Sequence, residues 1–362
     1  MASIELEDIT ASRGGQVLVR GVSLAIADRE RLVLLGASGS GKTSLLRVIA
    51  GVQEVDHGRI RIDGRDVTHA PPRERDLSMV TQDGSLQPHL DVRDNLGFSL
   101  RIRKTPRAQI DERVEAEARA FSLTDLLSRR PGTLAQGERH EVALARTLVR
   151  PGQHAVLVDE PFARIDAPRR ATLLRELVGL QEGYGLTLVV ATNDQRVAMG
   201  MAHRIAVLDR GALLQVDTAG TMHRRPADVV VAGAVGDPPM NLIEGRIQRL
   251  GGRVEVAADD LRIPTWEPAL TAHVGTRITV GIRPTDLTLT DEGGAGVIHG
   301  TVRQRAFLGP SVALHVDDGQ RTLTAVVPTP GVGAGTAVKL ALQPADVHVF
   351  DAVTGLALAH GV

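Results

Sequence analysis

The sequence has 362 residues, of which 43% are hydrophobic and 23% are charged, so it is long and apolar enough for two or more packed domains with ordinary polar surfaces. A formal net charge of -1 and an aromatic content of 2% argue against a nucleic-acid partner, and the absence of cysteine excludes disulfides and thiolate metal sites. The first residues lack a signal-peptide pattern and no apolar run approaches the roughly 18 residues that cross a bilayer, which predicts a protein of the cytoplasm or one held at a membrane by a partner.

The first 235 residues mix short apolar runs with helical patterns. Runs rich in β-branched residues, typical of buried parallel strands, lie at 31–35, 154–158 and 186–191. Helical spacing of apolar residues is found at 42–50, 108–121, 138–149 and 168–181. This order predicts an α/β sheet covered on both faces. The mainly helical stretch of about 85–150 lies between two of the strands and predicts an inserted helical subdomain.

The strongest local signal is GASGSGKT at residues 36–43, which follows a predicted strand and opens a predicted helix. It fits the phosphate-loop pattern G-x-x-x-x-G-K-[ST] in the context that the pattern requires. Its glycines let backbone N–H groups approach a triphosphate, Lys42 supplies a positive charge to the β- and γ-phosphates, and the Thr43 hydroxyl can bind Mg²⁺. A glycine-rich turn that ends in Lys-Thr by chance is the alternative. We expect the following residues to bind ATP: Gly36, Ala37, Ser38, Gly39, Ser40, Gly41, Lys42, Thr43 and Ser44.

A second signal is AVLVDEP at residues 155–161, where a buried strand ends in two adjacent carboxylates. Asp159 can bind Mg²⁺, and Glu160 can orient an attacking water or accept its proton. An acidic turn at a strand end is common on its own, but here it follows a phosphate loop by about 120 residues. We therefore expect Glu160 and Lys42 to be catalytic.

After residue 235 the sequence becomes a series of short β-rich runs broken by turn residues, beginning with GDPPMN at 236–241. GTRITVGIRPTDLTL at 275–289 recurs as GTAVKLALQPADVHV at 335–349, an offset of 60 residues. Gly245 and Gly300 begin the two units at a similar offset. The repeat predicts two related β-units that form a small barrel or a pair of barrels. Chance similarity in a β-rich tail is the alternative.

Together these motifs resemble the ATP-binding subunit of an ABC importer, in the sugar-importer branch typified by maltose-type systems, over essentially the whole chain. Further resemblance lies in Gln82 of MVTQDGSLQPHL, in Asp166 of ARIDA, in MAHRIAVLDRGALLQVDT at 201–218 and in GDPPMN. The resemblance implies an α/β fold, with a RecA-like P-loop NTPase core and a helical insert in residues 1–235. It implies a small all-β, OB-like TOBE domain in residues 236–362, with a regulatory or dimerisation role.

The same resemblance implies an ATPase that uses ATP and Mg²⁺ to energise uptake of a sugar or similar solute. Its implied partners are two transmembrane permease subunits, an extracytoplasmic solute-binding protein and a second ATPase subunit, on the cytoplasmic side of the cell membrane. Gln82 is implied as a Mg²⁺ ligand beside Thr43 and Asp159, and residues 82–90 as the segment that docks the membrane partner. No nucleic-acid partner is implied.

Three positions depart from the family pattern. The signature Leu-Ser-Gly-Gly-Gln reads LAQGE at 134–138, so a serine hydroxyl and a glycine are lost and a carboxylate is gained. The catalytic switch histidine is replaced by Asn193, whose amide can donate a hydrogen bond but cannot carry a charge. The aromatic residue that stacks on adenine is replaced by Arg13, which either stacks through its guanidinium group or lies in solvent.

We expect Ala135, Gln136 and Gly137 still to face the γ-phosphate held by a second subunit, and Glu138 to repel it unless its carboxylate is protonated or turned away. Two functions remain open. One is an ATPase motor, and the other is a catalytically weak nucleotide-binding subunit with a structural or regulatory role, possible in a homodimer or beside an active paralogue. Retention of Glu160 favours the motor, because an inactive site has no chemical need for that acid.

Overall fold

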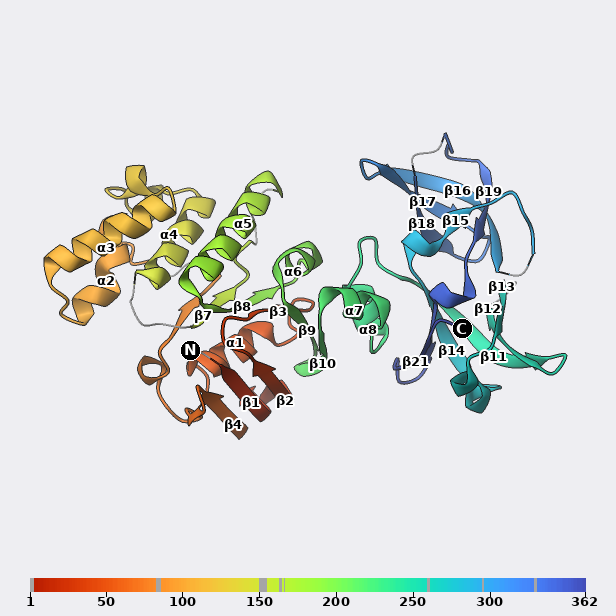
Figure 1. Ribbon diagram of the computed structural model, residues 1–362, viewed down its shortest axis with the longest axis horizontal. Helices are drawn as coiled ribbons and strands as arrows, with labels where there is room; N and C mark the ends of the chain where they lie inside the picture. Colours follow the sequence, from red (N-terminus) through yellow and green to blue (C-terminus); the bar gives the residue numbers. More distant parts are fainter. Residues whose placement is uncertain are drawn as a thin grey trace. The chain divides into compact units, whose positions relative to one another are not determined.

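The computed structural model describes residues 3–82, 86–149, 155–162, 165, 167–258, 261–294, 296–328 and 331–362. Three parts of the sequence predictions lie outside these ranges. They are Asp166, the first residue (His154) of the strand expected at 154–158, and residues 83–85 of the expected docking segment. The chain forms two compact units, Met1–Thr218 and Ala219–Val362 (Figure 1). The structure therefore groups residues 219–235 with the second unit, whereas the domain boundary predicted from the sequence follows residue 235.

A six-stranded sheet forms the centre of the first unit. Across the sheet the strands are β10 (Ala212–Asp217), β9 (Arg204–Asp209), β3 (Arg31–Leu35), β8 (Thr187–Thr192), β7 (Ala155–Asp159) and β6 (Leu77–Val80). All are parallel except β10, which runs antiparallel to β9. Every residue of β7 and β8 is buried, so both faces of the sheet are covered, as the sequence predicted. Figure 1 shows α1 (Lys42–Ala50) on one side of this sheet and α5 (Ala167–Tyr184) with α6 (Gln195–Met201) on the other.

A second, antiparallel sheet shares a hydrophobic core with α1 and the central sheet. Its strands in order are β2 (Gln16–Ile26), β1 (Ile4–Arg13), β4 (His57–Ile62) and β5 (Arg65–Asp66). Gly14 and Gly15, with φ angles of 59° and 80°, form the two-residue turn between β1 and β2. Such a turn needs positive φ at both positions, which glycine adopts without strain. The turn sets Arg13 opposite Gln16.

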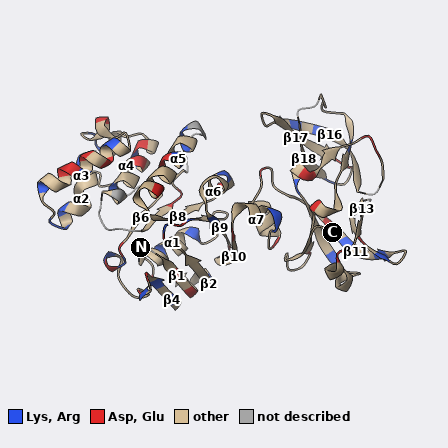
Figure 2. Ribbon diagram, in the orientation of Figure 1, with Lys and Arg blue, Asp and Glu red and all other residues tan. Residues whose placement is uncertain are grey.

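The helical insert lies between β6 and β7, which pair with each other in the central sheet. Its helices are α2 (Val92–Ile102), α3 (Arg107–Ala120) and α4 (Gln136–Leu148), with short 3-10 turns η2 (Thr124–Leu126) and η3 (Pro131–Thr133); another turn, η1 (Pro72–Glu74), precedes β6. Basic and acidic residues are interspersed along α2 and α3 (Figure 2), and the Arg101 side chain donates a hydrogen bond to Asp94 at 2.7 Å. The fully buried Asn95 donates to the carbonyls of Gln87 and Leu90 and ties down the segment before α2. This confirms the predicted insert.

The second unit begins with the short helices α7 (Ala219–Arg224) and α8 (Val229–Ala234) and continues as two antiparallel sheets around one hydrophobic core. One sheet has the order β13 (Leu261–Thr265), β12 (Arg253–Ala258), β11 (Asn241–Leu250), β14 (Arg277–Ile282), β20 (Val347–Asp351) and β21 (Ala357–His360). The other has the order β15 (Thr288–Leu289), β19 (Ala337–Ala341), β16 (Val297–Phe307), β17 (Ser311–Asp317) and β18 (Thr322–Pro328). The 3-10 turns are η4 (Pro268–His273), η5 (Pro284–Asp286) and η6 (Pro344–Asp346). Within the described ranges, no helix of the chain combines the length and the apolar character that crossing a membrane requires.

The two sheets confirm the internal repeat. In each unit of the repeat a three-stranded meander leads to a strand, a 3-10 turn and a further strand: β11 to β15 in the first, and β16 to β20 in the second. The last strands are exchanged, because β14 pairs with β20 and β19 pairs with β15. The repeat units therefore complete each other's sheets and enclose a shared core.

Arg283, directly after β14, holds residues 219–235 to the second unit. Its side chain is 2% exposed and donates hydrogen bonds to the carbonyls of His223 (2.8 Å), Ala232 (3.0 Å) and Val235. Burial disfavours the charged guanidinium and lowers the pKa of Arg283 to about 10. These contacts explain why α7 and α8 belong to the second unit.

Replacing Arg283 by alanine is expected to destabilise the second unit by about 3 kcal/mol or more, because three buried carbonyls lose their donor. Urea unfolding of the full chain, followed by circular dichroism, measures this loss. Arg277→Ala on the exposed start of β14 is the matched control and should change stability by less than about 0.5 kcal/mol. Equal losses for both variants would contradict the bracing role of Arg283.

Candidate nucleotide-binding site

The phosphate loop, residues 36–41, connects β3 to α1, and both elements are anchored in the core of the first unit. Gly41 precedes α1 with a φ of 104°, and a Cβ at this position would lie 2.7 Å from the Leu18 carbonyl oxygen. A Cβ on Gly36 would lie 2.4 Å from the Leu208 carbonyl oxygen. Both positions therefore require glycine. At the loop tip, Ala37, Ser38 and Gly39 are exposed, whereas Ser40 is buried and Ser44 is half-buried in the first turn of α1.

Lys42 is held inside the loop. Its side chain is 5% exposed, and Nζ donates to the carbonyls of Gly36 at 2.8 Å and Ala37 at 3.0 Å. Nζ lies 3.9 Å from Oε1 of Glu160. Burial lowers the pKa of Lys42, and the charges of Glu160 and Asp159 act against this shift. The ammonium group is thus placed between the loop carbonyls and the two acids.

The two predicted acids lie together at the end of β7. The Thr43 hydroxyl donates to Oδ1 of Asp159 at 2.9 Å. Burial raises the pKa of Asp159, and the Thr43 hydrogen bond and the charges of Arg47 and Lys42 oppose the shift. Asp159 therefore lies at the start of α1, where a cation bound to the nucleotide would be found.

Glu160 is held by the end of β8. Its backbone has a φ of 48°, an uncommon value for a residue with a side chain, and its N–H donates to the Ala191 carbonyl at 2.9 Å. Its carboxylate accepts hydrogen bonds from the Thr192 hydroxyl and the Asn193 N–H. Burial raises the pKa of Glu160, mainly against the opposing charge of Lys42. The strained backbone and the two donors fix the carboxylate beside the phosphate loop.

The parallel sheet explains why these residues meet. The carboxyl ends of β3, β6, β7 and β8 lie at one edge, where ligands bind in open α/β sheets. Gln82 follows β6 and Asn193 follows β8, both with exposed side chains at that edge. Among the residues that the structure describes, no three acidic or histidine side chains converge on a metal site. A Mg²⁺ ion at Thr43 and Asp159 would therefore need oxygen ligands from the nucleotide, which is its usual coordination.

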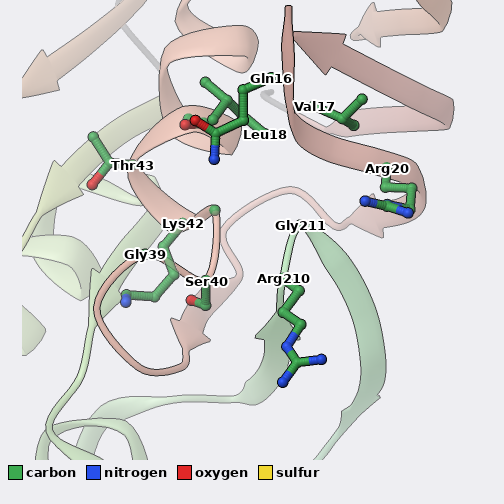
Figure 3. A pocket seen from close by; sticks show the side chains of 12 residues that line it. Gln16, Val17, Leu18, Arg20, Gly39, Ser40, Lys42, Thr43, Arg210 and Gly211 are labelled. Atoms are coloured by element: carbon green, nitrogen blue, oxygen red, sulfur yellow. The ribbon is translucent and has the colours of Figure 1, made fainter. Parts of the chain in front are cut away.

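A pocket of about 570 Å³ opens beside the phosphate loop (Figure 3). Figure 3 shows Lys42 and Thr43 on one side and Arg20, from β2, and Arg210, from the turn between β9 and β10, on the other. The lining residues are Gln16, Val17, Leu18, Arg20, Gly39, Ser40, Gly41, Lys42, Thr43, Ser44, Arg210 and Gly211. Arg13 is exposed and is not one of these lining residues, although its strand partner Gln16 is one of them. The sequence patterns missed both arginines, because β2 and the β9–β10 turn are far apart in the chain.

The LAQGE segment lies at the start of α4, and Ala135, Gln136 and Gly137 do not line this pocket. Ala135 is the N-cap residue and has no side-chain acceptor for the helix. The Glu138 carboxylate accepts a hydrogen bond from the Ala135 N–H at 2.6 Å and lies 3.5 Å from Nη1 of Arg129. Glu138 is therefore turned onto the start of its own helix, where one backbone donor already has an anionic partner.

Family profiles match three segments of the chain. The family profile described as "ABC transporter" matches residues 19–163, "MalK OB fold domain" matches 236–287 and "TOBE domain" matches 280–350. The fold predicted from the sequence, a P-loop NTPase core followed by an OB-like TOBE domain, is confirmed.

Among relatives, the chain is 37% identical to the diacetylchitobiose uptake system ATP-binding protein MsiK of Streptomyces coelicolor, over 98% of this chain and 99% of that protein. It is 38% identical to the sn-glycerol-3-phosphate import ATP-binding protein UgpC of Cereibacter sphaeroides, over 98% and 99%. It is 36% identical to the trehalose/maltose import ATP-binding protein MalK of Thermococcus litoralis, over 99% and 100%.

Among solved structures, the dimeric structure of MJ0796, a bacterial ABC transporter cassette, covers 59% of this chain and 98% of its own, with a TM-score of 0.55 and 25% identity. The shared fold, the phosphate loop with its two acids and the near-full-length relatives agree. The chain belongs to the ATP-binding subunits of ABC transporters and is an ATPase coupled to transport.

Proposed function

We propose that this ATPase energises uptake of a sugar or a similar solute. It lies on the cytoplasmic side of the membrane, with two transmembrane permease subunits, an extracytoplasmic solute-binding protein and a second ATPase subunit as partners. Support for import comes from relatives named for uptake of diacetylchitobiose, sn-glycerol 3-phosphate and trehalose or maltose. The observation that carries ATP turnover is the contact of Lys42 and Thr43 with Glu160 and Asp159.

In the proposed mechanism, the loop amides and Lys42 hold the β- and γ-phosphates. Mg²⁺, when bound, neutralises phosphate charge; the Thr43 hydroxyl, the Asp159 carboxylate and the Gln82 amide oxygen would hold it, and an all-oxygen set suits this ion. The Glu160 carboxylate accepts the proton of a water whose oxygen bonds to the γ-phosphorus while the P–O bond to ADP breaks. Because Glu160 is in contact with Lys42 and is hydrogen-bonded to Thr192 and Asn193, we favour ATP turnover over a purely structural or regulatory role.

The rate of ATP turnover at this site depends on two positions that depart from the family pattern. The Asn193 N–H holds Glu160 in place, and its exposed side chain supplies one neutral donor to the γ-phosphate. Ala135, Gln136 and Gly137 face the nucleotide held by the second subunit. Glu138, hydrogen-bonded to the Ala135 N–H, must give up that donor before a phosphate can use it. We therefore expect ATP-driven closure to be weakened by this carboxylate.

Replacing Glu138 by glutamine is expected to raise ATP turnover of the assembled complex by about three- to tenfold. The substitution removes a negative charge from the start of α4 and weakens the competing hydrogen bond to Ala135. Steady-state phosphate release at saturating Mg-ATP measures the effect. Glu115→Gln, an exposed acid on α3 of the same helical insert, should leave the rate unchanged. An unchanged rate for Glu138→Gln in a fully assembled complex would show that the carboxylate does not oppose closure.

The experiment that tests nucleotide binding is calorimetric titration of the full chain with Mg-ATP. Lys42→Ala is expected to weaken binding about tenfold or more, because a charge-assisted hydrogen bond to phosphate is worth about 1.5–3 kcal/mol. Lys104→Ala, on an exposed loop between α2 and α3, serves as the control and should bind like the wild type. If neither the full chain nor its complex with the membrane partners binds Mg-ATP, the proposed function fails. Solute uptake by proteoliposomes that contain the complex then tests import.

A further inference from the structure

The half of the pocket away from the phosphate loop is cationic, and none of the described residues that line it is aromatic. The twelve described residues that line the whole pocket include three cations, Lys42, Arg20 and Arg210, and no aspartate or glutamate. An aromatic surface for a nucleobase is absent from this lining, and Gln16 and Val17 are the exposed neutral side chains of the β2 wall. The charge of the pocket therefore suits a polyanion along its whole length, and not only at the phosphate loop.

Arg210 is presented by a turn that is locked to both neighbouring walls. Arg210 and Gly211 have φ angles of 46° and 82° and form the two-residue turn between β9 and β10. The Gly211 N–H donates to the Ser40 carbonyl at 2.9 Å, and the Gly211 carbonyl accepts from the Arg20 N–H at 2.8 Å. A Cβ on Gly211 would lie 2.8 Å from the Leu18 carbonyl oxygen. The turn is thus fixed between the phosphate loop and β2.

Turn chemistry does not account for an arginine at position 210. A turn with positive φ at both positions favours asparagine, aspartate or glycine at the first. The Arg210 side chain is 93% exposed, and its Nε lies 3.8 Å from Oδ2 of the half-buried Asp209, a long surface contact that contributes little. Within the described part of the chain, no side chain accepts a hydrogen bond from the Arg20 guanidinium. The Arg20 guanidinium is accessible to a ligand, and the weak contact with Asp209 leaves the 93% exposed Arg210 side chain accessible as well.

We propose that Arg20 and Arg210 bind the α-phosphate and nucleoside end of the nucleotide, so that this subunit recognises the polyphosphate and discriminates weakly between purine bases. The proposal rests on the nucleotide site described above. A guanidinium group can bind phosphate through two parallel hydrogen bonds and can stack on the face of either purine. Arg20 and Arg210 thus take the place of a base-selective aromatic contact, and Arg13 lies outside the contact.

Calorimetric titration of the full chain with Mg-ATP, Mg-GTP and inorganic tripolyphosphate, at low and high salt, tests the proposal. Wild type should bind Mg-ATP and Mg-GTP within about threefold of each other. Arg20→Ala and Arg210→Ala should each weaken both by about three- to tenfold, with a smaller salt dependence. Arg210→Asn, which suits the turn but lacks the charge, should match Arg210→Ala, and Arg210→Lys should recover part of the affinity. Arg65→Ala on exposed β5 is the control and should bind like the wild type.

The outcomes separate this proposal from the proposed function. If Arg13→Ala weakens Mg-ATP more than Mg-GTP while Arg20→Ala and Arg210→Ala bind like the wild type, the base stacks on Arg13 and the proposal is overturned. A wild-type preference for Mg-ATP over Mg-GTP of more than about tenfold would also overturn it. In both cases, loss of binding in Lys42→Ala would leave the proposed function standing. Absence of any Mg-ATP binding by wild type would instead remove the proposed function itself.

Discussion

Replacing Glu160 by glutamine is expected to lower ATP turnover of the assembled complex by about 10²- to 10⁴-fold, which is the range that a positioned general base contributes. Glutamine keeps the size of the side chain and one oxygen for the Asn193 N–H and the Thr192 hydroxyl, but it cannot accept a proton from water. Affinity for Mg-ATP should stay within about threefold of wild type, because Lys42 and the loop amides remain. Steady-state turnover and calorimetric titration, measured on the same preparation, separate the two effects.

The pH profile provides the control for this role. Burial raises the pKa of Glu160 above its ordinary value of 4.5, and only the ionised carboxylate can take a proton. Turnover should therefore fall as pH falls through the raised pKa, on a limb that lies above pH 4.5. The residual turnover of Glu160→Gln should lack this limb. Equal turnover by wild type and Glu160→Gln would contradict hydrolysis at this site.

Replacing Asn193 by histidine is expected to raise ATP turnover by about 10- to 100-fold. A single donor to a developing negative charge is worth about 10²–10³ in rate, and a histidine donor can also carry a positive charge. The position suits this role, since Asn193 follows β8 at the sheet edge and its backbone N–H already bonds Glu160. Single-turnover hydrolysis with excess enzyme measures the chemical step without interference from ADP release.

Two further variants show whether the gain comes from the γ-phosphate. Asn193→Ala should be no faster than wild type, because it removes the amide donor. The double variant Asn193→His with Glu160→Gln should lose the gain, since the new donor assists a step that still needs the base. A histidine variant that binds Mg-ATP normally but hydrolyses it at the wild-type rate would place residue 193 away from the phosphate.

Short-range patterns predicted the phosphate loop and its flanks well. The strand at 31–35 and the helix at 42–50 are found at the predicted residues, because a buried parallel strand and a glycine-rich helix start are both strong local signals. The strands β1 and β2 were not predicted; their many exposed positions and irregular register hide the alternation that marks a strand. Tertiary contacts, and not propensity, hold them in the sheet.

Some residues of the candidate site could be predicted from the sequence, and others could be found only in the structure. Lys42, Thr43, Asp159 and Glu160 follow from sequence because parallel strands bring their carboxyl ends to one edge. Sequence patterns could not predict Arg20 and Arg210 as site residues, because β2 and the β9–β10 turn come together only in the folded chain. For Glu138 a signal was present: an acid three residues after an N-cap position is half of a capping box, and it predicts a carboxylate that returns to its own helix.

The exchange of β15 and β20 between the repeated halves of the second unit has a consequence for folding. Neither half has a complete sheet without a strand from the other: without β20, the ladder edge of β14 opposite β11 is unpaired, and without β15, the edge of β19 opposite β16 is unpaired. Nascent chain that ends before residue 347 therefore lacks the strand that pairs with β14, and the sheet of the first half is completed only when the end of the second half docks on it. Melting of this unit should be all-or-none, although its sequence is a tandem duplication.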